Sequence, residues 1–336
     1  MMKRFLSFAL IILLAAAGFS YFVFVAPNIN GKRVSIKIPT GSTYKDVLRI
    51  LKENNALKSE YTFSLVSKMK HYPDRVKPGY YVFDKKLNNR QIVNMLRAGL
   101  QTPVTLVIYN IRTKEEFAGL VGRTLELDSN ELLAKLNDKE FCKTYGLDTN
   151  NILSRFIVDN YEFYWNVSFD KFMEKLNTAY SQFWNVERNV KAKALNLTPE
   201  KVTTLASIVE KEVIFDKELT MVAGVYLNRL AIGMPLQADP TLVFALRDFD
   251  ARRVNSTHKE YDSPYNTYMY AGLPPGPICM PRKKSMDAVL NYQQHRCLYF
   301  CANPDMSGNS IFSKTYEEQM NVAAKYRRTL DKLNVH

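Results

Sequence analysis

The chain has 336 residues, a length that accommodates about two domains and a membrane anchor. Apolar residues make up 46% of it, which excludes a largely disordered chain. The formal net charge is +13, but the basic residues are dispersed, and the densest short run is at 281–284. Because nucleic-acid binders concentrate their charge on one helix or patch, this distribution argues against nucleic acid and favours an anionic polymer or a membrane surface.

The N-terminus predicts a single membrane anchor. Lys3 and Arg4 precede an uncharged apolar run at 5–26, and a helix of about 20 residues spans the hydrocarbon core. A cleaved signal peptide is the alternative, but the apolar run continues past the small residues at 15–20. We therefore predict a cytoplasmic tail at 1–4 and an uncleaved anchor at 5–26. Basic residues flank both ends of the run, so charge alone leaves its orientation open.

The next segment, 34–98, predicts a small β-α-α-β-α module. The residues at 33–41 alternate as in a strand, and Ser42 or Thr43 can cap the helix that follows at 42–57. A second helix at 61–70, a strand at 79–84 and a helix at 88–99 that ends at Gly99 complete the module. A strand and helix at 104–121 weakly repeat the pattern of residues 34–51.

The remainder, 100–336, predicts a mixed domain. Helices are expected at 114–122, 129–138, 169–194, 199–213, 221–233, 240–247, 285–291 and from about 315, with strands at 297–303 and 310–313. A long loop rich in proline, glycine and tyrosine occupies 263–281. Because strands and helices do not alternate strictly, the fold class is α+β rather than a doubly wound sheet.

The cysteines and histidines give no sign of a metal site. Four cysteines (Cys142, Cys279, Cys297 and Cys301) form no C-x-x-C pair, and only four histidines are present, so we predict no zinc, no other metal and no cofactor. An extended strand holds Cys297 and Cys301 too far apart for a disulfide. Any other pairing among the four stays open.

The helix at 199–213 carries two glutamates, Glu210 and Glu212. Thr198 is the expected N-cap and Pro199 the first helical residue. At about 100° per residue, the two carboxylates fall on opposite flanks of the apolar stripe. Periodicity does not choose between them, and the ordinary interpretation is that both are solvated edges of the helix.

Three motifs follow one another along the chain: "LASIVEKE" at 205–212, "VYLNRLAIGMPLQADPT" at 225–241 and "SPYNTYMYAGLPPGPI" at 263–278. In their order and spacing they resemble the endolytic murein transglycosylases (MltG or YceG-like proteins). "GYYVF" and "NYEFYW" match weaker family segments, so the resemblance extends over nearly the whole chain after the anchor.

The resemblance implies a membrane-anchored enzyme of the cytoplasmic (inner) membrane, with its body on the periplasmic or extracytoplasmic side. Such enzymes cut the MurNAc–GlcNAc β-1,4 bond within nascent peptidoglycan strands without water, leave 1,6-anhydro-MurNAc ends and so terminate strand elongation. The family pattern predicts Glu210, the first Glu of "VEKE", as the catalytic acid, with a raised pKa. One carboxylate suffices because the 6-hydroxyl of the sugar replaces the second carboxylate of an ordinary glycosidase. Glu212 is expected to be a salt-bridged or solvated structural residue.

Further residues are candidates for substrate binding. Asp239 is either the N-cap of the helix at 240–247 or, with Gln237, a contact to sugar. In "SPYNTY", we expect Tyr265, Asn266 and Tyr268 to contact a pyranose, the alternative being a loop held by tyrosine packing. Glu162, among the aromatics of "NYEFYW", is a weaker second carboxylate.

The resemblance also implies that residues 34–98 are a LysM-like module, which either holds a glycan strand or serves as a spacer. The expected partners are peptidoglycan strands, the membrane and cell-wall synthases. Two histidines common near the family's C-terminus are absent here, where Ser310, Gln319 and Met320 occur instead, so no role is carried over for them. A peptidoglycan hydrolase using Asp239 or Glu162, and a non-catalytic scaffold for synthases, are the competing interpretations.

Overall fold

The computed structural model describes residues 2–250 and 255–332. Met1 of the predicted tail, and residues 251–254 and 333–336 of the predicted catalytic domain, lie outside the described residues. The chain forms two compact units. Unit 1 comprises Met1–Leu106, Val121–Asp128 and Tyr161–Phe169, and unit 2 comprises Val107–Leu120, Ser129–Asn160 and Asp170–His336.

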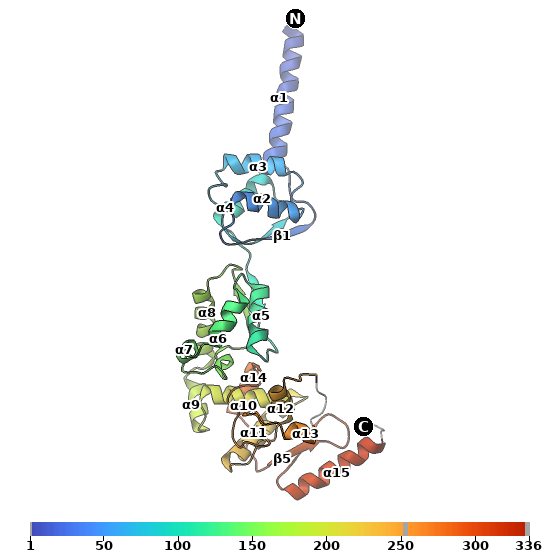
Figure 1. The fold of residues 1–336 in the computed structure, drawn as a ribbon. Helices are drawn as coiled ribbons and strands as arrows, with labels where there is room; N and C mark the ends of the chain where they lie inside the picture. The colour runs from blue at the N-terminus through green and yellow to red at the C-terminus, as the bar shows by residue number, and fades with distance from the viewer. Residues whose placement is uncertain (1, 251–254, 333–336) are drawn as a thin grey trace. The chain divides into compact units, whose positions relative to one another are not determined.

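Unit 1 begins with a long apolar helix, α1 (Met2–Phe24), drawn in blue in Figure 1. Its stretch Arg4–Phe24 is, by length and composition, able to cross a membrane, and no other helix of the described residues meets that criterion. The predicted apolar N-terminal helix is therefore present. A membrane anchor and a signal sequence both have such a helix.

The module of unit 1 follows the predicted order of elements. Strand β1 (Arg33–Ile38) pairs antiparallel with β2 (Gly79–Asp84), with Arg33 opposite Asp84 and Ile38 opposite Gly79. Helices α2 (Tyr44–Glu53), α3 (Glu60–Met69) and α4 (Asn89–Ala98) complete it.

Local signals in the sequence fix the ends of these helices. Thr43 and Asp46 form a capping box that starts α2, and Gly99 adopts a left-handed conformation with φ of 72° after α4. The prediction for this segment is therefore confirmed at the level of its elements, whereas its likeness to LysM stays a prediction.

The remaining strands are short. Strand β3 (Val104–Val107) and strand β4 (Asn160–Phe163) form one two-stranded sheet, and β5 (Tyr299–Ala302) and β6 (Ser310–Ser313) form another. In the part of the chain that is described, the fold is mostly helical with small antiparallel sheets, which confirms the α+β class.

The middle of the chain is a series of short helices. These are α5 (Lys114–Thr124), α6 (Ser129–Leu136), α7 (Lys139–Lys143), the 3₁₀ turn η1 (Ile152–Arg155), α8 (Phe169–Phe183) and α9 (Val186–Ala194). The single helix expected at 169–194 is wrong, because the chain breaks at Trp184 and Asn185. Asn185 is an N-cap whose side chain accepts from the backbone N–H of Arg188, and this bond starts a new helix.

Unit 2 is built around α10 (Pro199–Glu212). Its residues from Val202 to Val209 are all buried, including Thr203, Thr204 and Ser207. The two threonine hydroxyls donate to the carbonyls of Pro199 and Glu200, four residues earlier, and so remain satisfied within the core.

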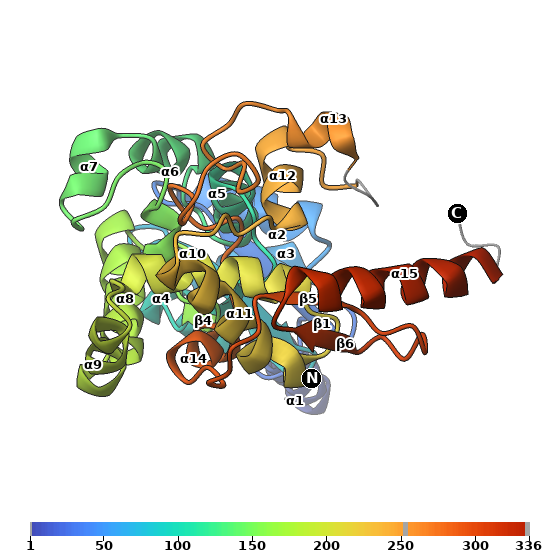
Figure 2. The ribbon, with the colours of Figure 1, turned by 90° about the horizontal axis from the view of Figure 1, so that it is seen from below.

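Helices α11 (Leu219–Ala231), α12 (Asp239–Leu246) and α14 (Lys283–Leu290) pack against α10, as do α9 and η1. Figure 2 shows this group from below, with the C-terminal helix α15 (Tyr316–Lys332) beside β5 and β6. The 3₁₀ turn η2 (Asp216–Glu218) precedes α11, and the short helix α13 (Ser256–Lys259) precedes the loop at 263–281. That loop lies in the predicted place, with no helix or strand from 260 to 282.

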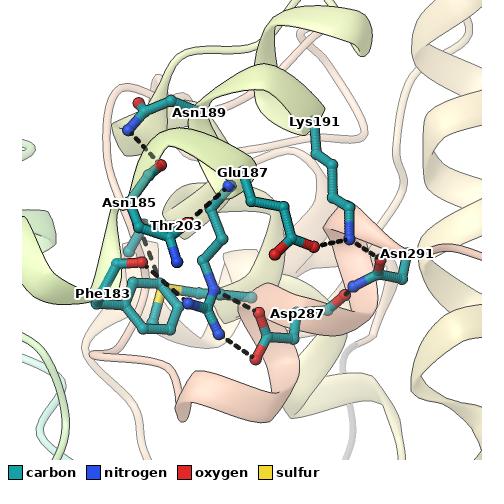
Figure 3. A network of polar contacts seen from close by, with 10 residues as sticks. Phe183, Asn185, Glu187, Asn189, Lys191, Thr203, Asp287 and Asn291 are labelled. Atoms are coloured by element: carbon teal, nitrogen blue, oxygen red, sulfur yellow. Dashed lines mark hydrogen bonds and ion pairs between the residues drawn. The ribbon is translucent and has the colours of Figure 1, made fainter.

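Polar contacts join α9 to α14 (Figure 3). Arg188 binds both carboxylate oxygens of Asp287, at 2.7 and 3.1 Å. Lys191 donates to Glu187 on its own helix and to Asn291 after α14. A bidentate arginine–carboxylate pair restrains orientation as well as distance, so these contacts hold α14 beside α9.

Candidate active site

The two glutamates at the end of α10 face different neighbours, as their positions on opposite flanks predict. Glu210 faces α14. Its Oε2 accepts from the backbone N–H of Arg282 at 2.8 Å and from the hydroxyl of Ser285 at 2.6 Å, and it lies 3.3 Å from Nε of Arg282. Arg282 is the N-cap residue of α14, so the carboxylate of Glu210 lies at the positive end of that helix. These contacts tie the end of α10 to the start of α14.

Glu212 faces α11 instead. Its Oε1 accepts a hydrogen bond from the hydroxyl of Tyr226 at 2.9 Å, and no ion pair to it is found among the described residues. Burial raises the pKa of the Glu212 carboxyl to about 7. The hydrogen bond from Tyr226 lowers it, the charge of Asp239 raises it, and Arg229 lowers it. The expectation of a salt-bridged or solvated Glu212 is therefore wrong, since this carboxyl is partly buried beside a tyrosine.

Two of the sequence motifs interlock beside Glu212. The hydroxyl groups of Thr241 in α12 and Thr267 in the loop are buried and lie 2.9 Å apart. The backbone N–H of Ala238 donates to the Thr267 hydroxyl at 3.0 Å, and that of Gln237 donates to the Thr267 carbonyl at 2.9 Å. These bonds fix the start of α12 against the "SPYNTY" loop.

Asp239 is the first residue of α12, and Ala238 occupies the N-cap position without a side-chain bond. The Asp239 carboxylate instead accepts from the hydroxyl of Tyr268 at 2.5 Å. Asp239 is exposed, and its charge acts on Glu212, so it lies at the same site. Asp239 is therefore not the N-cap of α12, and its contact to sugar stays a prediction.

The other loop residues have distinct positions. Asn266 is fully buried, and its amide donates to the carbonyls of Lys259 and Tyr261 while its oxygen accepts from the backbone N–H of Tyr268. These bonds use both of its donor hydrogens, so Asn266 positions the loop. Tyr265 packs its ring 4.8 Å from that of Phe244 in α12, and burial raises its pKa to about 12.

Gln237 is exposed and has a φ of 51°, an uncommon conformation for a residue other than glycine. Strained residues of this kind cluster at functional sites. Glu162 is exposed on β4 and belongs to unit 1.

Sequence reasoning missed four residues that shape the site. Tyr226 and Arg229 lie one turn apart on α11, and Arg282 and Ser285 lie at the start of α14. Arg229 is buried, and its guanidinium donates to the carbonyls of Leu298 and Leu236. For Tyr226 and Arg229 the signal in the sequence was the "VYLNRL" motif, in which the two residues stand three apart, one helical turn. Arg282 lies in the basic run at 281–284, and no motif pointed to Ser285.

Polar contacts also hold the region around Ser310 and Gln319. Ser310 donates its backbone N–H and its hydroxyl to the buried carboxylate of Glu218, and Gln319 donates to the carbonyl of Phe300. All four cysteines are free. Within residues 2–250 and 255–332, no group of three or more His, Cys, Asp or Glu side chains is placed to hold a metal ion.

Comparisons with known proteins agree with this arrangement of motifs. The endolytic murein transglycosylase of Bacillus subtilis (strain 168) is 30% identical over 316 residues, covering 87% of this chain and 84% of that protein. The endolytic murein transglycosylase of Streptococcus pneumoniae (serotype 2, strain D39) is 27% identical over 346 residues, and this chain spans 61% of its length. A crystal structure of a yceG-like protein from Listeria monocytogenes matches 87% of this chain and 99% of its own, with a TM-score of 0.60 and 29% identity. The profile of the YceG-like family matches residues 36–325, and the chain belongs to that family.

Proposed function

We propose that this protein is an endolytic murein transglycosylase that cuts the MurNAc–GlcNAc β-1,4 bond of peptidoglycan strands and leaves 1,6-anhydro-MurNAc ends. The observation that carries the proposal is the carboxyl of Glu212, which has a pKa of about 7 and lies beside Asp239 and Tyr268 of the two downstream motifs. A group with this pKa is protonated in a large fraction of molecules at neutral pH, as a general acid must be.

The proposed reaction uses one carboxyl group twice. The proton of Glu212 passes to the glycosidic oxygen as the bond from that oxygen to C1 of MurNAc breaks. The 6-hydroxyl oxygen of the same MurNAc then bonds to C1, and its proton returns to the Glu212 carboxylate. Atoms balance without water, and the enzyme ends in its starting protonation state.

This assignment differs from the sequence-based prediction of Glu210. Glu210 is held by the backbone N–H and side chain of Arg282 and by the hydroxyl of Ser285, so its carboxyl group is already engaged in contacts to α14. Glu212 has a single hydrogen-bond partner among the described residues, and that partner is a neutral tyrosine. We therefore propose Glu212 as the acid and Glu210 as the residue that holds α14, and the prediction for Glu210 remains open to the test below.

Neighbouring side chains supply the proposed contacts to the sugars. Asp239 and Gln237 are exposed, and Tyr265 and Tyr268 are partly buried. We assign these residues to binding and Asn266 to positioning of the loop. A hydrolase remains the second candidate, because Asp239 is a second carboxylate at the site and can serve as a base for water.

The remaining parts of the chain fit a wall enzyme at the membrane. We propose that α1 is an uncleaved anchor that keeps units 1 and 2 outside the cytoplasmic membrane, where nascent strands and their synthases are found. We further propose that residues 34–98 act as a LysM-like module that holds a strand near the site. Cutting new strands there terminates their elongation.

The test is cleavage of uncross-linked glycan strands by the full-length protein in detergent, with products identified by mass spectrometry. Wild type, Glu212→Gln and Glu210→Gln form the matched set, since each substitution removes one charge and keeps the shape. We expect anhydro-MurNAc ends from wild type, a loss of at least about a hundredfold in Glu212→Gln, and a smaller loss in Glu210→Gln.

Other outcomes have defined meanings. Loss confined to Glu210→Gln restores the family-based assignment of the acid. Reducing ends that carry oxygen from labelled water identify a hydrolase and direct attention to Asp239. No cleavage by wild type, with strand binding retained, identifies a scaffold and refutes the proposed function.

A further inference from the structure

A cavity in unit 2 is unused by the proposed chemistry. It has a volume of about 460 Å³ and is enclosed by the start of α5, residues 149–153, the end of α12 and the long loop. Phe244 of α12 and Tyr265 and Pro277 of the loop contribute to its wall. One of the three sequence motifs, the one at 263–278, thus borders this cavity as well as the Glu212 site.

The cavity is rich in positive charge. Arg112, Lys114 and Arg247 line it, against one acid, Glu115. Arg247 and Glu115 form an exposed ion pair at 3.6 Å, but neither Arg112 nor Lys114 forms an ion pair with any described residue. We call this cavity the cationic pocket.

Both unpaired cations are held in place by neutral groups. The guanidinium of Arg112 lies 4.6 Å above the ring of Phe249, and its Nη1 donates to the Phe249 carbonyl at 3.5 Å. The ammonium of Lys114 donates to Asn137 and to the Thr149 carbonyl. Their positions are therefore fixed before any ligand arrives, which reduces the entropy that binding must overcome.

The acids near the cationic pocket are already engaged. Glu116 accepts from the backbone N–H of Arg112, and Asp148 accepts from those of Asn150 and Asn151. Burial lowers the pKa of Lys114, the charge of Glu115 raises it, and the nearby charge of Arg247 lowers it. Two like charges close together in a half-buried site are stabilised by an anion between them.

One helix, α12, connects the cationic pocket to the site of the proposed acid. Asp239, at the first residue of α12, belongs to the Glu212 site, and Phe244 and Arg247, at the other end of the same helix, border the pocket. Eight helical residues span roughly 10 Å at 1.5 Å per residue. A strand bound at Glu212 therefore presents a neighbouring sugar, or the substituent on it, to the pocket.

We propose that the cationic pocket binds the carboxylate-bearing peptide stem attached to a MurNAc residue, so that the enzyme prefers strands that still carry their stems. The proposal rests on the proposed function and names the part of the substrate that selects it. Arginine and lysine side chains bind carboxylates through charge-assisted hydrogen bonds. Tyr265 and Phe244 offer an apolar wall to the methyl groups of alanine residues in such a stem.

The experiment compares two substrates, stem-bearing strands and strands stripped of their stems by an amidase, with the full-length protein in detergent. The measured quantity is the stem preference, defined as kcat/KM for stem-bearing strands divided by kcat/KM for stripped strands. We expect a preference above one for wild type. Arg112→Gln should lower it about three- to tenfold, as expected for the loss of one charge-assisted contact, and Arg112→Lys should retain most of it.

Two further variants test whether the charge of the cationic pocket sets the stem preference. Glu115→Gln removes the acid that lines the cationic pocket and should raise the stem preference. Lys193→Gln removes an exposed charge from α9, outside the pocket, and should leave the preference as in wild type. Thermal denaturation of each variant identifies loss of fold.

A preference of one in wild type, or an unchanged preference in Arg112→Gln, overturns the proposal. Cleavage of stripped strands by wild type reports the proposed function independently of the pocket. If wild type cleaves neither substrate, the proposed function fails, and titration with soluble stem-bearing fragments then decides the cationic pocket. Equal affinity of wild type and Arg112→Gln for these fragments overturns it, and weaker binding by Arg112→Gln supports it.

Discussion

At the scale of single residues, Glu212 should make stability depend on pH. Its pKa is raised from 4.5 to about 7, so the folded protein holds this proton more tightly than the unfolded chain does. The free energy of unfolding therefore falls as pH rises from about 4.5 to 7 and stays low above that range. Glu212→Gln should gain up to about 3 kcal/mol over wild type at pH 8 and little at pH 4.5.

Urea unfolding of wild type and Glu212→Gln at these two pH values measures the difference. Glu210→Gln is the matched control on the same helix, and it should lose stability at pH 8 because it gives up the contacts to Arg282 and Ser285. Equal stability of wild type and Glu212→Gln at pH 8 would contradict the buried protonated state.

Tyr226 should set the upper pH limit of activity. Its hydroxyl donates to Glu212 and lowers the pKa of that carboxyl. In Tyr226→Phe the pKa should rise, so the alkaline limb of the profile of kcat/KM should move up by about one pH unit, the size expected for one hydrogen bond to a charged group. The measurement is cleavage of glycan strands between pH 5 and 9.

Tyr270→Phe is the control for this change. It removes the same kind of hydroxyl–carboxylate bond, from Tyr270 to Asp262, at an exposed position of the same loop. Its pH profile should match wild type. An alkaline limb that moves equally in both variants, or in neither, removes Tyr226 from the control of Glu212.

At the scale of elements, one glycine decides how the "GLPPGPI" segment is seated. A Cβ atom on Gly276 would lie 2.1 Å from the carbonyl oxygen of Asn150, a separation that no real contact allows. Gly276→Ala should force the loop away from residues 149–151 and cost about 3 kcal/mol or more of stability. Thermal unfolding measures this cost, and cleavage of glycan strands should fall with it.

Pro275→Ala is the neighbouring control, because Pro275 is exposed in the same loop. It should unfold within about 0.5 kcal/mol of wild type, as most surface changes do. If Gly276→Ala were as stable as Pro275→Ala, the close approach of this loop to Asn150 would be refuted.

Most elements were predictable because their signals are local. The capping box at Thr43, the αL residue Gly99 and the Pro199 start of α10 each depend on a few adjacent residues. The break at Asn185 was missed because apolar periodicity continues across it, and only the capping bond to Arg188 N–H shows the boundary.

The choice between Glu210 and Glu212 as the acid could not be predicted from local signals, because it depends on tertiary packing. The sequence placed Glu210 and Glu212 on opposite flanks, and that is what the structure has. It did not show that α14 would bring Arg282 and Ser285 to one flank and that α11 would bring Tyr226 to the other. Asn266 was likewise expected at the substrate, whereas its amide is used to hold the loop. Sequence motifs thus identify candidate residues, but the role of each residue depends on its tertiary contacts.

At the scale of the whole molecule, the apolar N-terminal helix is also part of a folded core. Val23, near the end of α1, is only 2% exposed, and it packs with Ile29, Phe63 and other core residues of unit 1. The buried amide of Asn89 donates to the Val23 carbonyl at 2.9 Å. The last turn of α1 therefore supports the module, whatever the rest of that helix does in a membrane.

This arrangement predicts how soluble fragments behave. A fragment that begins at Asn28 loses the Val23 side chain and the acceptor for Asn89, and it should be less stable than one that begins at Tyr21 by about 2 kcal/mol, the sum expected for one buried valine and one hydrogen bond. Urea unfolding of the two fragments gives the difference. In the longer fragment, Val23→Ala should reproduce part of this loss of stability. Phe22→Ala should have little effect on stability, since Phe22 is 53% exposed. Equal stability of the two fragments would mean that the module folds without α1, and that the helix serves only as an anchor or signal.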